Sequence, residues 1–451
     1  MSRFQALIWI LLGVGLAAGC RKAGRSAADE PKTSAPSRPV SGPLAADEAQ
    51  MVCLADPAGD TDTDRDVRSQ QKRVGERPAK PDEWVLAGRN WVRKARHASD
   101  PGFYVNADAC AAVAIELEPD YAPAQELRGL VLMNEHKFEE ARRLAETVLE
   151  RDAENVVALG TLSDALLELG RYDEAVAAAQ RQMSARPGMA AHARGSYHRW
   201  LRGDTRYAKQ LIKDALIDRD GRDPEPAAWA FVEAATIYWH QADYEGADAV
   251  YAEALKWVPD YPPALLGRGR IAIAQGRAGQ AIAHLEKAAR LRPSAESLWL
   301  LGDARRMQGD EAGAQEAYGR VVELGRRGDS LTLALFYATK NRDIEDALRL
   351  VEAERALRGG IYLDDTYAWA LYRAGRLDEA RRAAERAIRL GTKDARLLYH
   401  AGAVRMATGE EASGRKLVQQ ALALNPHFDA TGSAEARALL EEAPRRVAST
   451  R

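Results

Sequence analysis

A small residue recurs along this 451-residue chain at an almost fixed interval. The successive intervals are 34, 34, 33, 39, 34, 33, 33, 33 and 34 residues. A period near 34 is typical of repeat proteins, in which a unit cannot bury its apolar face alone and stacks on its neighbours. The period therefore predicts an array of similar units instead of separate globular domains. The ten positions are Ala107, Ala141, Ala175, Ala208, Ala247, Ala281, Ala314, Ala347, Ala380 and Gly414.

Each unit is predicted to be two helices joined by a short turn. In one unit, residues 157–169 are apolar at helical intervals, and Gly170 follows as a helix-ending residue. Asp173 and Glu174 then place negative charge in the first turn of a second helix. The recurring alanine lies on that second helix, and we expect it to be small because the paired helices cross closely there. The pattern therefore predicts an all-α fold.

The units resemble tetratricopeptide repeats, whose consensus contains W-x2-L-G-x2-Y, then A-x3-F, then a closing proline. One unit matches this consensus with Leu301-Gly302 followed by Ala314-x3-Tyr318. The resemblance covers about residues 84–430. It implies a right-handed superhelical solenoid of about ten helix-turn-helix repeats.

The repeat pattern is irregular at several joints. Extra residues occur at 99–102 in the first unit and at 220–224, where the interval lengthens to 39. The units that begin at Leu331 and Ile361 lack the closing proline. We expect a local irregularity near residues 217–226, and these joints leave the curvature of the solenoid open.

The first 19 residues differ from the rest of the chain. Residues 4–16 form an uncharged stretch after Arg3, and Ala17-Ala18-Gly19-Cys20 follows. An apolar stretch of this length before small residues is typical of a secretory signal peptide, because a membrane span needs about 20 apolar residues. The end of the segment also resembles a bacterial lipobox, in which the cysteine is lipidated. The alternative is an ordinary signal peptide with an incidental cysteine.

The lipobox resemblance also implies a location. A chain lipidated at Cys20 would be held in the cell envelope by its acyl chains. Residue 21 is arginine and not the aspartate that retains lipoproteins on the inner membrane, so the resemblance implies an outer-membrane lipoprotein facing the periplasm if the host is Gram-negative. Residues 20–43, rich in Ala, Ser, Pro and charge, are expected to form a disordered tether.

The segments beside the repeats are expected to cover the open ends of the solenoid. Residues 44–83 are predicted to be an N-terminal capping or linker segment, and residues 431–451 a C-terminal capping helix and tail. The chain has three cysteines. With Cys20 lipidated in an oxidising compartment, we predict a disulfide between Cys53 and Cys110. The alternative is that both are small buried apolar residues.

Motifs for catalysis and cofactor binding are missing from the sequence: it contains no P-loop, H-E-x-x-H, C-x-x-C or G-x-S-x-G. Residues 267–272 fit the loose dinucleotide pattern, but they fall within an expected helix. Residues 60–64 begin like a calcium loop, yet Arg65 and Gln71 replace the required glycine and acid. We therefore predict no catalytic residue, cofactor or metal, and the net charge of −2 gives no reason to expect nucleic acid.

The resemblance to tetratricopeptide repeats implies a concave groove lined by the first helix of each unit. Aromatic and arginine side chains on a polar helix face are common anchors for protein partners. The alternative is that the aromatic residues pack between neighbouring repeats. The predicted partner-binding residues are Arg194, His198, Thr236, Trp239, Arg270, Trp299, Asp303, Arg306, Trp369, Tyr372 and Tyr399.

These features together predict a non-catalytic scaffold in the cell envelope that binds protein or peptide segments in its groove, with a lipid anchor as its contact with the membrane. One alternative is a structural or assembly subunit of an envelope machine that packs through its outer face. Another is an enzyme without a recognised motif. The sequence does not identify the partner.

Overall fold

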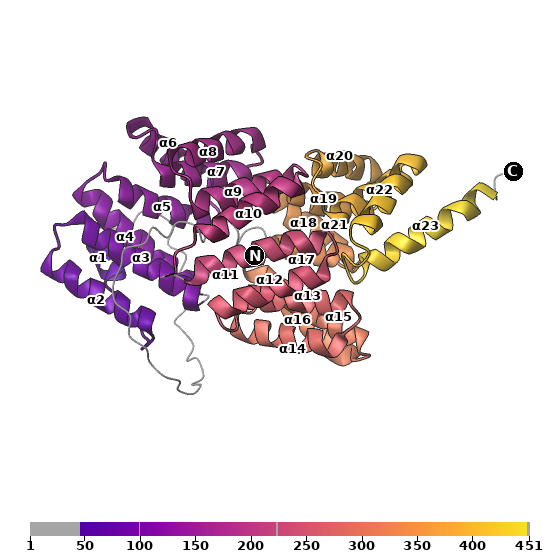
Figure 1. Ribbon diagram of the computed structural model, residues 1–451, viewed down its shortest axis with the longest axis horizontal. Helices are drawn as coiled ribbons and strands as arrows, with labels where there is room; N and C mark the ends of the chain where they lie inside the picture. Colours follow the sequence, from indigo (N-terminus) through magenta and orange to yellow (C-terminus); the bar gives the residue numbers. More distant parts are fainter. Residues whose placement is uncertain (1–45, 99, 222–223, 449–451) are drawn as a thin grey trace. The chain divides into compact units, whose positions relative to one another are not determined.

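A computed structural model describes residues 46–98, 100–221 and 224–448. Within these residues it contains 23 α-helices, one short 3₁₀ helix and no strand (Figure 1). The prediction of an all-α fold is therefore confirmed. The predicted signal peptide (1–19), Cys20 and the predicted tether (20–43) lie outside the described residues.

The chain divides into two compact units, and the division falls between Ala165 and Leu166, within α7. The N-terminal unit (46–165) contains α1 (Ala46–Cys53), α2 (Asp62–Glu76), α3 (Pro81–Ala98), the 3₁₀ helix η1 (Pro101–Phe103), α4 (Tyr104–Leu117), α5 (Ala122–Asn134), α6 (Phe138–Arg151) and most of α7 (Val156–Glu168).

The C-terminal unit (166–448) begins with the last turn of α7. Its other helices are α8 (Tyr172–Ala185), α9 (Met189–Leu201), α10 (Thr205–Ile217), α11 (Pro224–His240), α12 (Tyr244–Trp257), α13 (Pro262–Ala274), α14 (Ala278–Leu291), α15 (Ala295–Met307), α16 (Glu311–Gly328), α17 (Ser330–Thr339), α18 (Ile344–Arg355), α19 (Ile361–Arg373), α20 (Leu377–Ile388), α21 (Ala395–Ala407), α22 (Glu411–Leu424) and α23 (Gly432–Ala448).

Helices α3 to α22 follow one another as ten pairs along the chain. All ten small residues of the periodic series fall in the second helix of a pair, and all are buried. Ser196, in the first helix of one pair, donates a hydrogen bond from Oγ to the carbonyl oxygen of Ala208, over 2.8 Å. Such a contact brings the two backbones close together, which explains why the position holds a small residue.

The N-terminal unit contains the predicted disulfide between Cys53 and Cys110, whose Cα atoms lie 4.9 Å apart. The bond fixes α1 to α4, and both sulfur-bearing side chains are fully buried. The indole nitrogen of Trp91 donates to the carbonyl oxygen of Cys53, over 2.8 Å. Residues 46–83 belong to the core of this unit, because α1 contributes Ala49 and Cys53 to it and α2 contributes Val67 and Val74.

The acidic run at residues 60–64 begins a helix in the structure. Thr61 caps α2, and its side chain and backbone both bond with Asp64. Asp64 is buried and forms an ion pair with Lys94 of α3. Asp64, the innermost carboxylate of the run, is thus neutralised by a lysine, whereas Asp60 and Asp62 are exposed.

The two insertions have different outcomes. In the first repeat (α3 and α4), residues 101–103 form η1, and Phe103 stacks on Trp91 with ring centres 5.6 Å apart. The second insertion lengthens a helix: α11 has 17 residues, whereas α13 and α15 have 13 each. The irregularity expected near residues 217–226 corresponds to the end of α10 at Ile217 and the early start of α11 at Pro224.

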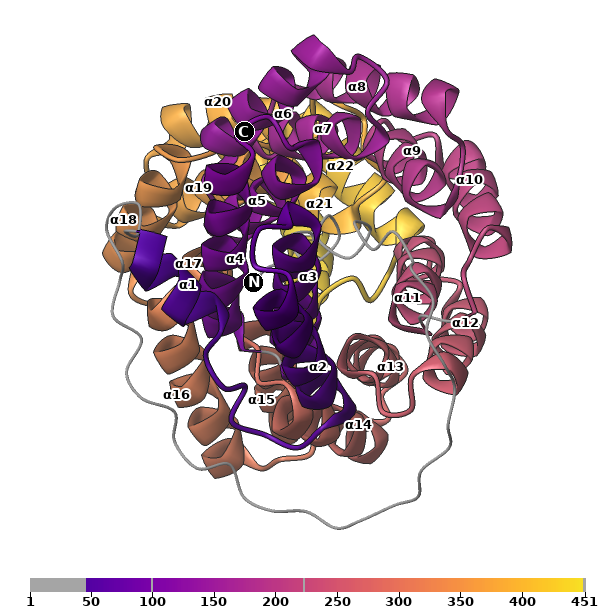
Figure 2. The same ribbon diagram turned by 90° about the vertical axis from the view of Figure 1, so that its left-hand side faces the viewer.

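The paired helices of the C-terminal unit follow one another around a circle in Figure 2. The first helix of each pair lies inside and the second outside, as α9 and α10, α11 and α12, and α13 and α14 show clearly. Successive first helices also contact one another, from α11 with α13 to α19 with α21. We call the side of α9, α11, α13, α15, α17, α19 and α21 that is turned inward the inner face.

The circle closes, because three loops dock on turns that precede them by almost 190 residues. Gly359 donates its backbone N–H to the carbonyl oxygen of Glu168, over 2.9 Å, and Asn425 Nδ2 donates to the carbonyl oxygen of Trp239, also over 2.9 Å. Side-chain hydrogen bonds across this junction join residues 181 to 191 positions apart. We call residues 358–361, 391–392 and 425–427 the docked loops.

Two of the docked loops, 358–361 and 391–392, lie at the ends of the repeats that lack the closing proline. A proline at Gly359 would remove the N–H that bonds Glu168, and a Cβ at this position would lie 2.8 Å from the carbonyl oxygen of Leu169. The sequence offset of these two loops is 189–191 residues, and that of the third is 181–186. The difference is explained by the 39-residue interval, because its extra residues precede the third receiving turn.

Candidate interaction surface

The tryptophans predicted to anchor a partner lie in first helices of their pairs but are buried in the core. Trp239 of α11, Trp299 of α15 and Trp369 of α19 are 4%, 7% and 1% exposed. The expectation that they are open to a partner is therefore wrong for this conformation. The alternative, packing between neighbouring repeats, describes them correctly because each contacts aromatic residues of its own or a neighbouring repeat.

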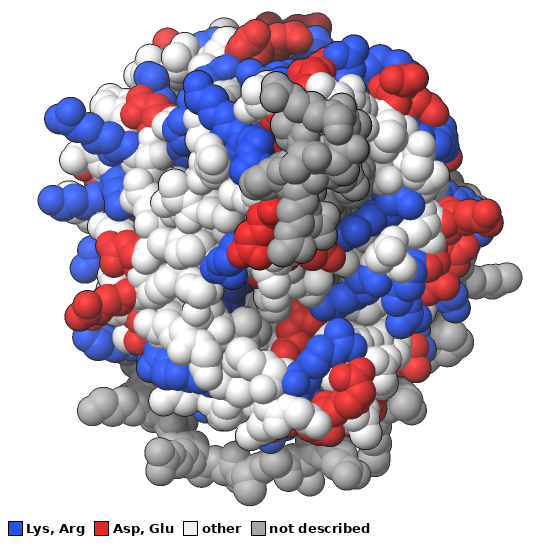
Figure 3. All heavy atoms as spheres, turned by 90° about the vertical axis from the view of Figure 1, so that its right-hand side faces the viewer, with Lys and Arg blue, Asp and Glu red and all other residues white. Residues whose placement is uncertain are grey.

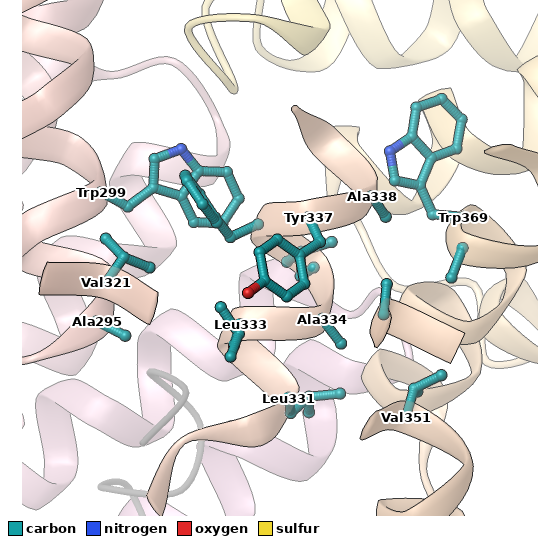
Figure 4. Close-up of a cluster of buried hydrophobic side chains, with 14 of the residues drawn as sticks. Ala295, Trp299, Val321, Leu331, Leu333, Ala334, Tyr337, Ala338, Val351 and Trp369 are labelled. Atoms are coloured by element: carbon teal, nitrogen blue, oxygen red, sulfur yellow. The ribbon is translucent and has the colours of Figure 1, made fainter. Parts of the chain in front are cut away.

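Figure 4 shows Trp299 and Trp369 on either side of α17 residues that include Leu333 and Tyr337. Trp299 meets the ring of Phe336 edge-on at 5.4 Å between ring centres. This edge-to-face arrangement adds to the stabilisation that the buried apolar area provides. The side chains of three consecutive first helices thus interlock in one core.

A buried polar cluster that the sequence reasoning missed surrounds Trp369. His400 of α21 stacks on the Trp369 ring at 4.0 Å between ring centres, and its Nδ1 lies 2.9 Å from Asp365 Oδ1. Arg396 Nε lies 3.4 Å from the other carboxylate oxygen of Asp365. The cluster contains a carboxylate, an imidazole and a guanidinium, so the buried charges compensate one another. The residues that form it recur one repeat apart, but no local motif marks them.

Asp303 was predicted to contact a partner, but its carboxylate is buried and is used within the chain. Its Oδ1 accepts hydrogen bonds from Tyr318 Oη at 2.5 Å and from Lys340 Nζ at 2.6 Å. Burial raises the pKa of Asp303, although Lys340 opposes this shift. Burial and the neighbouring carboxylate also raise the pKa of the Tyr318 hydroxyl.

Arg194 and His198 lie on α9 and are also buried. Arg194 donates to the side-chain oxygen of Gln182 on α8, over 3.2 Å. Burial, together with the charges of Arg194 and Arg202, lowers the pKa of His198 to about 3. These two side chains are therefore part of the packing between repeats and do not point into an open groove.

The other predicted side chains differ in how far they are exposed. Arg270 pairs with Glu296, and Arg306 pairs with Glu311 at 3.0 Å while its side chain stays 45% exposed. Tyr372 is half-buried and stacks on Trp369.

Tyr399 and Thr236, in contrast, are held within the unit. Tyr399 is buried and donates to Glu435 of α23 at 2.8 Å. The hydroxyl of Thr236 is half-buried and bonds the backbone of its own helix. Among the charged side chains of the predicted set, that of Arg306 is therefore the most exposed.

Two small cavities lie beside the closure of the circle. One, of about 40 Å³, is lined by residues that include Tyr172, Tyr362 and Arg358. The other, of about 20 Å³, is lined by residues that include Trp200 and Glu233. Cavities of this size hold water and not a peptide side chain.

On one face of the molecule, the described residues show charges of both signs. Basic and acidic residues are interspersed on the face drawn in Figure 3, with an uncharged area to the left of centre. No group of acidic, histidine or cysteine side chains in the described part of the chain could hold a metal ion. Among the helices of residues 46–98, 100–221 and 224–448, none is long and apolar enough to span a bilayer.

Several solved structures are similar to this chain. The chain is similar to the type IV pilus biogenesis factor PilW at 18% identity, over 44% of this chain and 90% of that chain, with a TM-score of 0.38. It is similar to human IFIT1, solved as a dimer with PPP-AAAA, at 14% identity, over 84% and 94% of the two chains, with a TM-score of 0.45. It is also similar to yeast Tom70 at 15% identity, over 86% and 97%, with a TM-score of 0.35. Likeness at this level carries nothing about what this chain binds.

Sequence profiles give the more direct comparison. None of the curated proteins matches the chain. Profiles of the tetratricopeptide repeat match residues 132–194, 238–299, 296–324 and 366–427. These segments include helix pairs from both units of the structure. The chain therefore contains tetratricopeptide repeats, as its periodic small residues predict.

Proposed function

We propose that this chain is a non-catalytic protein-interaction scaffold anchored in the cell envelope. The observation that carries the proposal is the succession of tetratricopeptide repeats, because stacked helix pairs present extended surfaces to protein partners. Anchoring rests on the sequence before the described residues, namely the apolar run 4–16 followed by small residues and Cys20. An outer-membrane lipoprotein facing the periplasm of a Gram-negative host agrees with Arg21.

A second candidate is an assembly subunit that packs through its outer face. The burial of the inner tryptophans favours it, since they offer nothing to a partner while the circle is closed. Tyr207 and Ile217 of α10, an outer helix, are 48% and 67% exposed. Large exposed apolar side chains are common where a protein meets a partner.

Photo-crosslinking in intact cells separates these candidates. A photoreactive residue would replace Arg306 on the inner helix α15 or Tyr207 on the outer helix α10, and the buried Tyr251 of α12 serves as the control because an aromatic photoreactive residue is close to it in size. A reproducible adduct with another protein from Arg306 supports the groove, and one from Tyr207 supports the assembly subunit. If all three positions give the same background of adducts, the scaffold function is contradicted.

The anchor has its own test. We expect the wild-type chain to partition into detergent and the Cys20→Ala variant to leave the membrane fraction, because lipidation requires the thiol. The measurement is cell fractionation followed by determination of the mature N-terminus. Normal processing of Cys20→Ala together with its full recovery in membranes would contradict lipidation.

A further inference from the structure

The segment between α22 and α23 lies along the inner face of the C-terminal unit. Phe428 packs on Tyr399 with ring centres 5.6 Å apart. Thr431 Oγ1 lies 3.1 Å from Lys340 Nζ, at the end of α17. Glu435, in the first turn of α23, reaches α19 and α21. The chain thus covers its own inner face at the side chains that a partner in the groove would meet.

Arg373 and Tyr399 form a carboxylate site around Glu435. Arg373 Nη2 and Tyr399 Oη both donate to Glu435 Oε2, over 2.7 and 2.8 Å. The guanidinium is held in place by its own chain, because its Nε donates to the carbonyl oxygen of Ala338 at 3.1 Å and the group lies over the Trp369 ring at 4.5 Å. Charge-assisted hydrogen bonds of this kind are among the stronger ones in proteins.

The two sides of this ion pair differ in accessibility. The side chain of Glu435 is 37% exposed, whereas that of Arg373 is only 16% exposed. The carboxylate of Glu435 is therefore the group that another carboxylate could replace, and Arg373 and Tyr399 would remain in place when it leaves.

We propose that Arg373 and Tyr399 are the carboxylate-binding site for an acidic helical segment of a protein partner, and that Glu435 fills this site in the resting chain. The partner segment carries a glutamate in its first helical turn and an aromatic residue about seven positions before it, as Glu435 and Phe428 do here. An acidic residue is favoured in that turn by the helix dipole. This proposal rests on the scaffold function and adds that the C-terminal helix must be displaced.

A synthetic peptide of residues 426–441 is the probe, added to the full-length chain. We expect it to bind a Glu435→Gln chain about tenfold more tightly than the wild-type chain, because the intramolecular competitor no longer occupies the site. Glutamine keeps the size of glutamate, so the variant should stay folded. Glu441→Gln, at an exposed position of the same helix, is the matched control and should behave as wild type.

Two further arms identify the contacts. A peptide that itself carries Glu435→Gln should lose most of its binding, since it lacks the carboxylate. Adding Tyr399→Phe to the Glu435→Gln chain should weaken binding of the unchanged peptide about fivefold, which is the effect of one lost hydrogen bond. Equal peptide affinity for wild-type and Glu435→Gln chains, or no binding to either, overturns the proposal. Neither result would contradict the scaffold function, because the crosslinking experiment tests that function separately and uses no peptide.

Discussion

Trp369 shows at the scale of one residue how burial changes the expected effect of a mutation. Its side chain is 1% exposed and is stacked on His400. We expect Trp369→Ala to lower the free energy of unfolding by about 3–5 kcal/mol, because a large cavity replaces the indole. Tyr207→Ala, which truncates an exposed aromatic residue, should cost less than about 0.5 kcal/mol.

Chemical denaturation of the two variants measures this difference. A Trp369→Ala protein as stable as wild type would show that the ring is outside the core and would restore the groove interpretation.

His198 makes the stability depend on pH. Its pKa is lowered to about 3 in the folded chain, whereas an unfolded histidine titrates near 6.5. As the pH falls below 6.5 the unfolded chain takes up the proton first, so the free energy of unfolding decreases until about pH 3. From pH 7.5 to pH 4.5 this side chain should account for about 3 kcal/mol.

Replacing the imidazole tests this origin of the pH dependence. We expect His198→Gln to flatten the decline between pH 7.5 and 4.5 in urea denaturation, whereas His97→Gln, at an exposed position on α3, should keep it. If the His198→Gln curve keeps the full wild-type slope, the buried imidazole is not its source.

At the scale of elements, glycine turns with the same backbone conformation have different surroundings. Gly203, before α10, has φ = +74°, and Gly276, before α14, has φ = +73°. A Cβ on Gly203 would overlap the carbonyl oxygen of Gly391 in a docked loop, whereas a Cβ on Gly276 would meet nothing within 4 Å. Thr392, in the same loop, donates to the carbonyl oxygen of Leu201.

The two glycines therefore make a matched pair. Both Gly→Ala variants carry the left-handed strain of about 1–2 kcal/mol. Gly203→Ala should cost about 1–3 kcal/mol more, because the docked loop must move. Hydrogen exchange at residues 391–393 should increase only in Gly203→Ala. Equal stability losses in the two variants would contradict the docking.

The interpretation of the helix pairs depended on local features that the sequence contains. Ala175 and its counterparts mark close crossings, and each pair can be assigned from about 34 residues without knowledge of the rest. Trp239, Trp299 and Trp369 lie in the first helix of a pair, as expected. Their burial was only one of two alternatives, because the sequence does not show which side chains of a neighbouring repeat, such as Phe336 beside Trp299, cover each ring.

At the scale of the whole molecule, closure of the circle makes distant repeats depend on each other. An open solenoid couples mainly nearest neighbours, so loss of its last repeats would leave distant ones unchanged. In this chain we expect a variant ending at residue 357 to lose hydrogen-exchange protection in α8 to α12. These helices lose the docked loops that bond Glu168, Leu201 and Trp239.

Hydrogen exchange read out by mass spectrometry covers all these helices in one experiment. If the loss of hydrogen-exchange protection is confined to α17 and α18, beside the new end, the docked loops add little stability and coupling is limited to neighbouring repeats. Loss that reaches α9 and α11 supports the closed circle.

The sequence by itself determined the repeat, its period and the all-α class, whereas the structure decided between the two alternatives for Cys53 and Cys110 in favour of the disulfide. The repeat, its period and the helical class follow from interactions within one repeat or between adjacent segments, where residue size and helix ends act locally. Only the tertiary structure decided that the repeats of the C-terminal unit return on themselves. The rotation from one repeat to the next is a small angle set by packing, and it accumulates over the roughly 190 residues between Glu168 and Arg358, so no local pattern records the sum that brings these two residues together.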